Sequence, residues 1–348
     1  MSAAGRMRGG ALARILLGLV LFAVIAAAGI VWHDYARFTT APLAVRGTDQ
    51  SIDIARGSSF KHIVGQLRGR HLSAAPAWYW RILALRMGVA KSLHAGEYAL
   101  PEGITPRRLL DNMAQGKVLR HQFTLIDGWT FKQVRTALNA AGKLAHDSAD
   151  MDDAAIMKRI GATDEDPEGR FLPETYAYVK GDTDLDLLKR AHQAMQKVLA
   201  DEWAARDPEV PLKSPYQALI LASLVEKETA RSDERSRIAG VFARRLKMGM
   251  PLQTDPTVIY GMGEDYHGDI TWKALRTDTP WNTYLHKGLP PTPIAMPGKV
   301  AIHAALHPAA GKALYFVARG DGSGRHVFSD TLGEHNRAVA CHQLKRCR

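Results

Sequence analysis

An uninterrupted apolar run near the N-terminus, residues 15–32, constrains this chain more than any other feature. The run holds 18 residues without a charged side chain, and a helix of about 20 apolar residues crosses the hydrocarbon core of a bilayer. Three arginines and no acidic residue precede it: Arg6, Arg8 and Arg14. Because positive charge keeps its end of a span in the cytoplasm, we expect a single-pass anchor in a bacterial inner membrane. Residues 1–14 would form a cytoplasmic basic tail, and the rest of the chain would lie in the periplasm.

A cleaved signal peptide is the alternative interpretation of the same run. The small residues Ala26, Ala27 and Ala28 could form a processing site after a shorter apolar core. Either interpretation exports the folded part of the chain. This matters because the net charge of +11 suits several anionic partners, including nucleic acid, anionic lipid and carboxylate-bearing polymers. Export argues against nucleic acid and leaves lipid head groups and cell-wall peptides.

The length of 348 residues suggests roughly two to three domains at about 150 residues each. Local patterns predict an α+β protein: a linker over 33–51, a small α/β module over 52–120 and a larger mixed α+β domain with a substrate cleft over 121–340. A short basic tail over 341–348 would follow. The sequence contains only two cysteines, Cys341 and Cys347, so it offers neither a disulfide framework nor a cysteine-rich zinc site. Whether these two cysteines pair is left open.

One glutamate stands out on a predicted buried helix. Ser214 and Pro215 are typical of a helix N-cap and first turn, and the apolar helix that they begin would run to residue 230. At about 100° per residue, Glu228 falls among Leu221 and Val225, whereas Glu226 lies nearer the polar stripe. Loss of water around a carboxyl group raises its pKa toward the range of a general acid. A structural ion pair between Glu228 and a nearby arginine, Arg231 or Arg235, is the alternative.

The segments that follow this helix are suited to line a cleft. A second helix is predicted over 233–248, capped by Ser232 and closed by Gly249. The polar run 252–261 and the segment 281–284 offer side chains that hydrogen-bond hydroxyl and N-acetyl groups, and the proline-rich segment 288–294 would form a stiff wall. Alternatively, the proline-rich segment is a surface loop whose prolines only add stability.

Metal chemistry is not favoured by the histidine pattern. Four histidines occur near the C-terminus: His303, His307, His326 and His335. None of them belongs to an H-E-x-x-H motif or a comparable ligand spacing. We therefore expect neither a metal nor another cofactor.

Four segments together resemble a known family, the endolytic murein transglycosylases or YceG-like proteins. They are ASLVEKETA (222–230), GVFARRLKMGMPLQTDPTVIYGMG (240–263), NTYLHKGLPPTPIAMPG (282–298) and YFVARGDGSGRHVFSDTLGEHN (315–336). The resemblance is strong over residues 168–336 and weaker over 52–116, which resembles that family's LysM-like module. Three positions depart from the family pattern: Asp127, Trp281 and Thr292.

The resemblance implies cleavage of the β-1,4 bond between MurNAc and GlcNAc inside peptidoglycan strands, which leaves a 1,6-anhydro-MurNAc end. The family's catalytic glutamate corresponds to Glu228, as general acid and then general base. The attacking C6 hydroxyl belongs to the substrate, so a second carboxylate of the usual glycosidase kind is not needed. Further family positions imply substrate contacts at Gln253, Thr254, Asp255, Thr257, Tyr260, Asn282 and Tyr284.

Two alternatives to this activity remain at the level of the sequence. One is a catalytically silent peptidoglycan-binding or scaffold protein, suggested by the LysM-like segment and the anchor. The other is an ordinary hydrolase that makes reducing ends. A short tether after the anchor would hold the enzyme where new strands emerge, so we expect it to act on nascent glycan beside a penicillin-binding synthase and to limit strand length.

Overall fold

The computed structural model describes residues 7–47 and 50–346 and confirms a mixed α+β protein with one long N-terminal apolar helix. Arg6 and Cys347, which the sequence analysis considered, lie outside the described residues. Cys341 is not a free thiol. The elements, in chain order, are α1 (Met7–Thr40), β1 (Ser51–Ile54), α2 (Phe60–Gly69), α3 (Ala77–Arg86), β2 (Gly96–Ala99), α4 (Pro106–Ala114), β3 (Arg120–Thr124), α5 (Phe131–Asn139), α6 (Asp153–Ile160), β4 (Thr175–Val179), α7 (Asp184–Ala204), α8 (Pro215–Glu228), α9 (Ser232–Lys247), α10 (Asp255–Met262), a 3₁₀ turn η1 (Gly263–Asp265), α11 (Trp272–Arg276), α12 (Lys299–Leu306), β5 (Tyr315–Ala318), β6 (His326–Ser329) and α13 (Leu332–His342).

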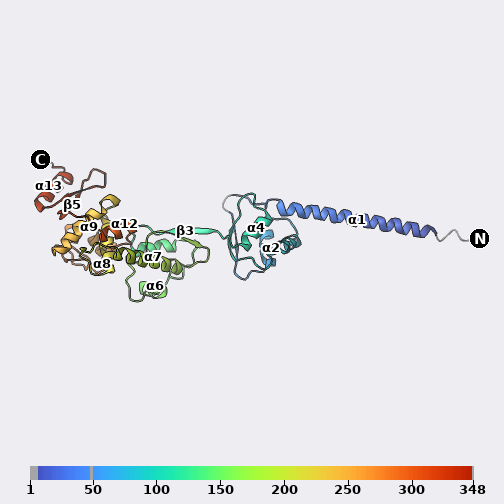
Figure 1. Ribbon diagram of the computed structural model, residues 1–348, viewed down its shortest axis with the longest axis horizontal. Coiled ribbons are helices and arrows are strands. Elements are labelled where there is room, and N and C mark those ends of the chain that lie inside the picture. Colours follow the sequence, from blue (N-terminus) through green and yellow to red (C-terminus); the bar gives the residue numbers. More distant parts are fainter. Residues whose placement is uncertain (1–6, 48–49, 347–348) are drawn as a thin grey trace, which may run out of the picture. The chain divides into compact units, whose positions relative to one another are not determined.

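The first helix, α1, is long and apolar enough to span a membrane, by its length and composition (Figure 1). Its apolar side chains, such as Leu17 and Phe22, are exposed rather than packed in a core. The helix does not end at residue 32 but continues to Thr40, so the first part of the predicted linker is helical. Tyr35 and Phe38 explain this extension, because they pack against the module that follows. Pro42, two residues beyond the end of α1, disfavours further helix.

The chain divides into two compact units, one up to Arg120 and the other from His121 onward. In the first unit β1 and β2 form an antiparallel pair, with Ser51 opposite Ala99 and Ile54 opposite Gly96. Helices α2 and α3 lie between these strands in sequence, and α4 follows. Ser59 caps α2 by accepting a hydrogen bond from the His62 amide at 3.2 Å. The side chain of Trp80 is fully buried in the core that these elements share.

The second unit contains two hydrophobic cores. The first core lies among β3, β4, α5, α6 and the start of α7, around Phe171 and Leu188. The other surrounds α8, which packs against α7, α9 and α12. Every side chain of α8 from Ala218 to Val225 is buried, including the hydroxyl of Ser223, which donates to the Ile220 carbonyl at 2.7 Å. A helix enclosed on several sides holds its last residue in a fixed place, and that residue is Glu228.

The C-terminal part of the second unit is a β-hairpin followed by a helix. Strands β5 and β6 pair antiparallel, with Tyr315 opposite Ser329, and α13 packs on both strands. Thr331 and Glu334 form a capping box that fixes where α13 begins. Arg245 on α9 holds the hairpin in place, because its Nε donates to the Leu314 carbonyl at 2.7 Å. His326 of β6 contacts Glu234 at the start of α9, so this part of the chain lies along α9 from its first turn to its last.

Candidate active site

Helix α8 delivers Glu228 to the edge of a cavity. The predicted N-cap is confirmed: the Ser214 hydroxyl accepts from the Gln217 amide at 3.3 Å. The helix ends two residues earlier than expected, because Thr229 has an extended backbone with φ −149° and ψ 134°. Glu228 is thus the last helical residue, at a point where the buried helix meets solvent.

The cavity beside Glu228 has a volume of about 470 Å³. Of the predicted substrate contacts, three line it together with Glu228: Gln253, Asp255 and Tyr284. Residues far along the chain form the rest of its wall, from β5, β6 and α13. Among them are Tyr315, His326, His335 and Asn336. The lining residues therefore come from widely separated parts of the chain, between Glu228 and Gln343.

The surroundings of Glu228 favour its protonated form. Burial of the Glu228 carboxyl group is the main reason that its pKa is raised to about 7. The Thr254 hydroxyl donates a hydrogen bond to Oε1 and partly offsets this increase. The negative charge of Asp255 raises the pKa further, and Arg245 lowers it. A carboxyl with this pKa exists in both protonation states near neutral pH, which a group that first gives and then takes a proton requires.

A buried hydrogen-bond network lies beneath the cavity and holds Thr254. The Thr254 amide donates to the Thr283 hydroxyl at 3.1 Å, and the Thr257 hydroxyl donates to the Thr254 carbonyl at 2.7 Å. The Asn282 amide group donates to the carbonyls of Leu275 and Thr277. Thr257 and Asn282 have no exposed surface, so the structure places these two predicted contacts under the cavity rather than on its wall.

Gln253 adopts an unusual backbone at the cavity wall. Its φ is +52°, in the left-handed region that costs a non-glycine residue free energy. Its amide donates to the Thr283 carbonyl at 3.1 Å, which holds this conformation. The exposed amide side chain is thereby directed by a fixed backbone, as is common at binding sites.

Tyr260 lies apart from the cavity. Its hydroxyl donates to Glu168 Oε2 at 3.1 Å, and its ring packs edge-on against Trp281 with centroids 5.4 Å apart. Glu168 is a second carboxyl with a raised pKa, about 7, caused mainly by burial. The sequence analysis missed it because it comes from a loop before β4, far from α8 in the chain. It also accepts from the Phe131 amide at 3.1 Å, at the first turn of α5.

The prediction that Glu226 lies near a polar stripe is wrong. Glu226 is buried and accepts from Arg235 Nη2 at 2.5 Å and from the Gly298 amide at 3.0 Å. Burial raises its pKa, while the Gly298 amide and Arg235 lower it. The structural ion pair considered for Glu228 is therefore made by Glu226, two residues earlier. That assignment leaves the carboxyl of Glu228 without an arginine partner at hydrogen-bond distance among the described residues.

Three donor groups elsewhere in this unit could hold a metal ion: Glu202, His303 and His307. They come from α7 and the end of α12 and do not line the cavity of Glu228. The two imidazole rings stack, with centroids 4.3 Å apart and an angle of 30° between planes. His303 Nδ1 lies 2.9 Å and His307 Nε2 lies 3.9 Å from the same oxygen, Glu202 Oε2, so both rings share one carboxylate partner.

Two of the three departures from the family pattern contact each other. The Trp281 indole donates to the Thr292 hydroxyl at 2.9 Å, and that hydroxyl also donates to the Pro293 carbonyl at 2.8 Å. A tryptophan at 281 thus has its one donor satisfied by the threonine at 292. Neither residue lines the cavity of Glu228.

Comparison with known proteins decides the family. The YceG-like family matches residues 52–341, most of the chain. The chain belongs to the YceG-like family. Its similarity extends to an endolytic murein transglycosylase of Bacillus subtilis, with 31% identity over 84% of each chain. A pneumococcal endolytic murein transglycosylase of Streptococcus pneumoniae serotype 2 is 26% identical over 93% of this chain and 64% of that protein.

A solved YceG-like structure agrees with the fold. The crystal structure of a YceG-like protein from Listeria monocytogenes is 30% identical and superposes with a TM-score of 0.53, covering 83% of this chain and 99% of that chain. The matched residues of the YceG-like family include β1, in the first unit, and the cavity of Glu228, in the second. The family match therefore extends over both units.

Proposed function

We propose that this YceG-like protein is a membrane-anchored endolytic murein transglycosylase that cleaves the MurNAc–GlcNAc bond within peptidoglycan strands. The observation that carries the proposal is the state of Glu228: a carboxyl whose pKa is raised to about 7, at the wall of a cavity of about 470 Å³. The relatives in B. subtilis and S. pneumoniae are named for this activity. The chain carries the carboxyl that such a reaction needs at the end of a rigid helix.

The proposed reaction uses Glu228 twice. The protonated carboxyl donates to the GlcNAc oxygen as the bond from MurNAc C1 to that oxygen breaks, and GlcNAc leaves with a hydroxyl. The resulting carboxylate takes the proton of the C6 hydroxyl of the same MurNAc, whose oxygen bonds to C1. No water is consumed, and Glu228 ends protonated. Because the substrate supplies its own nucleophile, the second carboxylate of ordinary glycosidases is not required.

The remaining cavity residues are assigned to binding and positioning. Asp255 accepts from the Tyr284 hydroxyl at 2.6 Å, so we assign this pair to holding sugar hydroxyl or amide groups. Gln253 provides a further amide at the wall. Thr254 sets the orientation of Glu228, while Thr257 and Asn282 support Thr254 and Tyr284 from below. Tyr260 would act through Glu168 rather than at the reacting bond.

The setting of the enzyme belongs to the same proposal. With α1 in the inner membrane and its basic end in the cytoplasm, both units would lie in the periplasm, on nascent glycan and beside a penicillin-binding synthase. The first unit has the order β1-α2-α3-β2 with an antiparallel strand pair, which supports a LysM-like module. Cleavage near the membrane would limit the length of new strands.

Mass spectrometry of purified, uncrosslinked glycan strands tests the activity. Incubation with the full chain in detergent is expected to yield internal fragments that end in 1,6-anhydro-MurNAc. Products heavier by one water would identify a hydrolase instead. Glycan binding without any cleavage would replace the proposal with a scaffold role.

The pH dependence of kcat/KM gives an independent check on Glu228. The general acid must be protonated in the free enzyme, so activity is expected to be full below a pH of about 7 and to fall roughly tenfold per unit above it. Thr254→Val removes the hydroxyl that lowers the pKa of Glu228, so the falling limb should move to higher pH. Thr136→Val is the matched control, because that exposed hydroxyl donates only to the Lys132 carbonyl within α5 and does not contact Glu228. An unchanged limb in Thr254→Val would contradict the assignment.

A further inference from the structure

The first unit carries a continuous basic segment on α2, α3 and the loops beside them. Residues 55–95 include seven lysines and arginines and no aspartate or glutamate. Lys61, Arg68, Arg81 and Lys91 are exposed and surround a groove between α2 and α3. A surface of one sign of charge attracts an anionic partner.

The groove itself is apolar and open. Its volume is about 750 Å³, and Phe60 and Val64 of α2 face Trp78 and Leu85 of α3 across it. Trp78 is 47% exposed and Leu85 is 61% exposed, and Ile82 is 38% exposed. Residues 78, 82 and 85 share one face of a helix, so α3 presents an apolar stripe bordered by basic side chains. This combination is typical of a helix that lies in a membrane interface.

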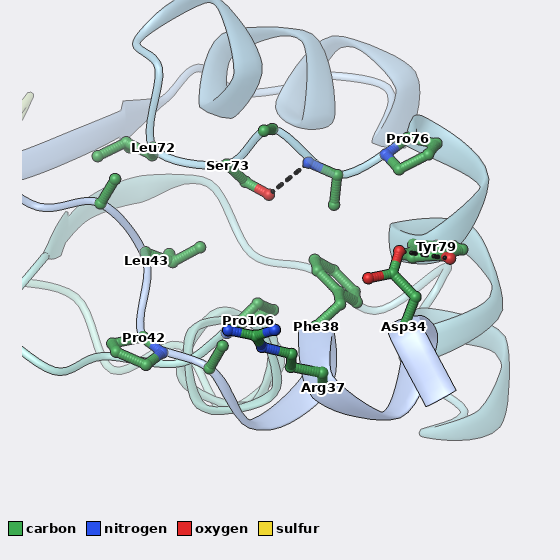
Figure 2. A pocket seen from close by; sticks show the side chains of 14 residues that line it. Asp34, Arg37, Phe38, Pro42, Leu43, Leu72, Ser73, Pro76, Tyr79 and Pro106 are labelled. Carbon is green, nitrogen blue, oxygen red and sulfur yellow. Dashed lines mark hydrogen bonds between the residues drawn. The ribbon is translucent and has the colours of Figure 1, made fainter. Parts of the chain in front are cut away.

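Contacts with α1 show where α3 lies along the apolar span. The Tyr79 hydroxyl donates to Asp34 Oδ2 at 3.0 Å, at the junction shown in Figure 2. At the other end of α3, Arg86 Cζ lies 4.9 Å from the centre of the Trp32 ring. Tyr79 also contacts Val31, Tyr35 and Phe38. Helix α3 therefore packs on residues 31–38 of α1, the segment that begins where the apolar run ends.

This level is where the uncharged part of α1 ends. Its 18 uncharged residues stop at Trp32, and His33 and Asp34 follow. At about 1.5 Å per residue such a segment nearly matches a hydrocarbon core of about 30 Å. Trp32, Tyr35, Tyr79 and Trp78 form a chain of ring contacts beside this end of the span, and aromatic residues are enriched at membrane interfaces.

We propose that the α3 stripe and the basic border of the α2–α3 groove bind the surface of the bilayer that α1 spans. Trp78, Ile82 and Leu85 enter the interfacial layer, and Arg81 and Lys91 contact the phosphates of anionic lipids. The occupant is lipid because the stripe lies on the helix that packs against the end of the apolar span, and the charge of the border complements anionic head groups. The module is then held against the membrane at two places, α1 and α3.

Quenching of tryptophan fluorescence by brominated acyl chains tests this placement. The full chain is reconstituted in vesicles of phosphatidylcholine and phosphatidylglycerol. Trp78→Phe is expected to remove roughly half of the quenched emission, the other half coming from Trp32 at the same interface. Trp272→Phe is the matched control, because Trp272 is 77% exposed but belongs to the other unit; it should leave the quenched emission unchanged.

A charge variant tests the choice of lipid. Arg81→Glu with Lys91→Glu keeps the apolar stripe and should reduce quenching of Trp78 in vesicles that contain phosphatidylglycerol. Trp32→Phe reports insertion of α1. If Trp32 is quenched and Trp78→Phe changes nothing, the proposal is overturned. It is also overturned if soluble glycan strands alter Trp78 emission in detergent while brominated lipids do not, because the groove would then be a glycan site.

Discussion

Glu228→Gln is expected to lower the rate of glycan cleavage by about 10³-fold or more, since one residue serves both as acid and as base. Glutamine keeps the size of the side chain and accepts the hydrogen bond of Thr254, but it cannot donate a proton of suitable acidity. Because the neutral form of Glu228 is substantially populated near pH 7, the neutral amide should leave folding and glycan binding close to wild type. The measurement is the initial rate of formation of anhydro-ended fragments, with binding measured in parallel.

Glu209→Gln is the matched control for this variant. Glu209 is in the same unit, is largely exposed, and forms only a surface ion pair with Lys247 at 3.6 Å. Its amide variant should cleave at the wild-type rate. Cleavage by Glu228→Gln within tenfold of the wild type would remove Glu228 from the mechanism. Loss of both cleavage and binding would instead mean that the residue shapes the cavity.

The largest effect on stability is expected at Arg235. Its guanidinium contacts Glu226, and the two side chains are only 10% and 4% exposed. Arg235→Met would leave a buried carboxyl without its cation, which typically costs about 3–5 kcal/mol. Glu226 also accepts from the Gly298 amide at the N-terminus of α12, so the same change loosens the contact among α8, α9 and α12. Denaturant unfolding of the variant measures the loss.

A double variant separates the ion pair from simple packing. Glu226→Leu with Arg235→Met removes both charges, and replacing a whole buried pair by apolar groups is often close to neutral. We expect the double variant to recover most of the stability that Arg235→Met loses. A single variant that loses less than about 1 kcal/mol would instead match the small worth of an exposed ion pair.

The sequence was informative where the decisive interactions are local. The N-cap at Ser214 and the polar-to-apolar pattern of α8 depend on neighbours within a few residues, and these predicted the helix and the unusual position of Glu228. The helix arithmetic failed for Glu226 because its burial comes from α9 and α12, which a single helix cannot reveal. Whether a carboxyl group on a helix face is buried depends on the elements that pack on that face, and the sequence of its own helix does not show these.

Long-range contributions were the part of the site that could not be predicted. The side chains of His335 and Asn336 reach the cavity from α13, more than a hundred residues after Glu228 in the sequence. No periodicity connects segments so far apart. The family resemblance implied that Tyr260 contacts substrate, but α10 turns it toward Glu168. The family resemblance included residues 315–336 but did not indicate that this segment lies beside Glu228.

Residues of β5, β6 and α13 line the cavity, so the active site is complete only after the C-terminal part of the chain has folded. Under the proposed topology, the segment after α1 crosses the membrane in chain order, so Glu228 arrives well before residues 315–343. Until those residues fold, the carboxyl is bordered on one side by water, and full solvation would return its pKa toward the ordinary value for glutamate. A half-exported chain is then a weak acid catalyst on an open surface. Under the proposed mechanism, we expect glycan cleavage only after residues 315–343 have folded.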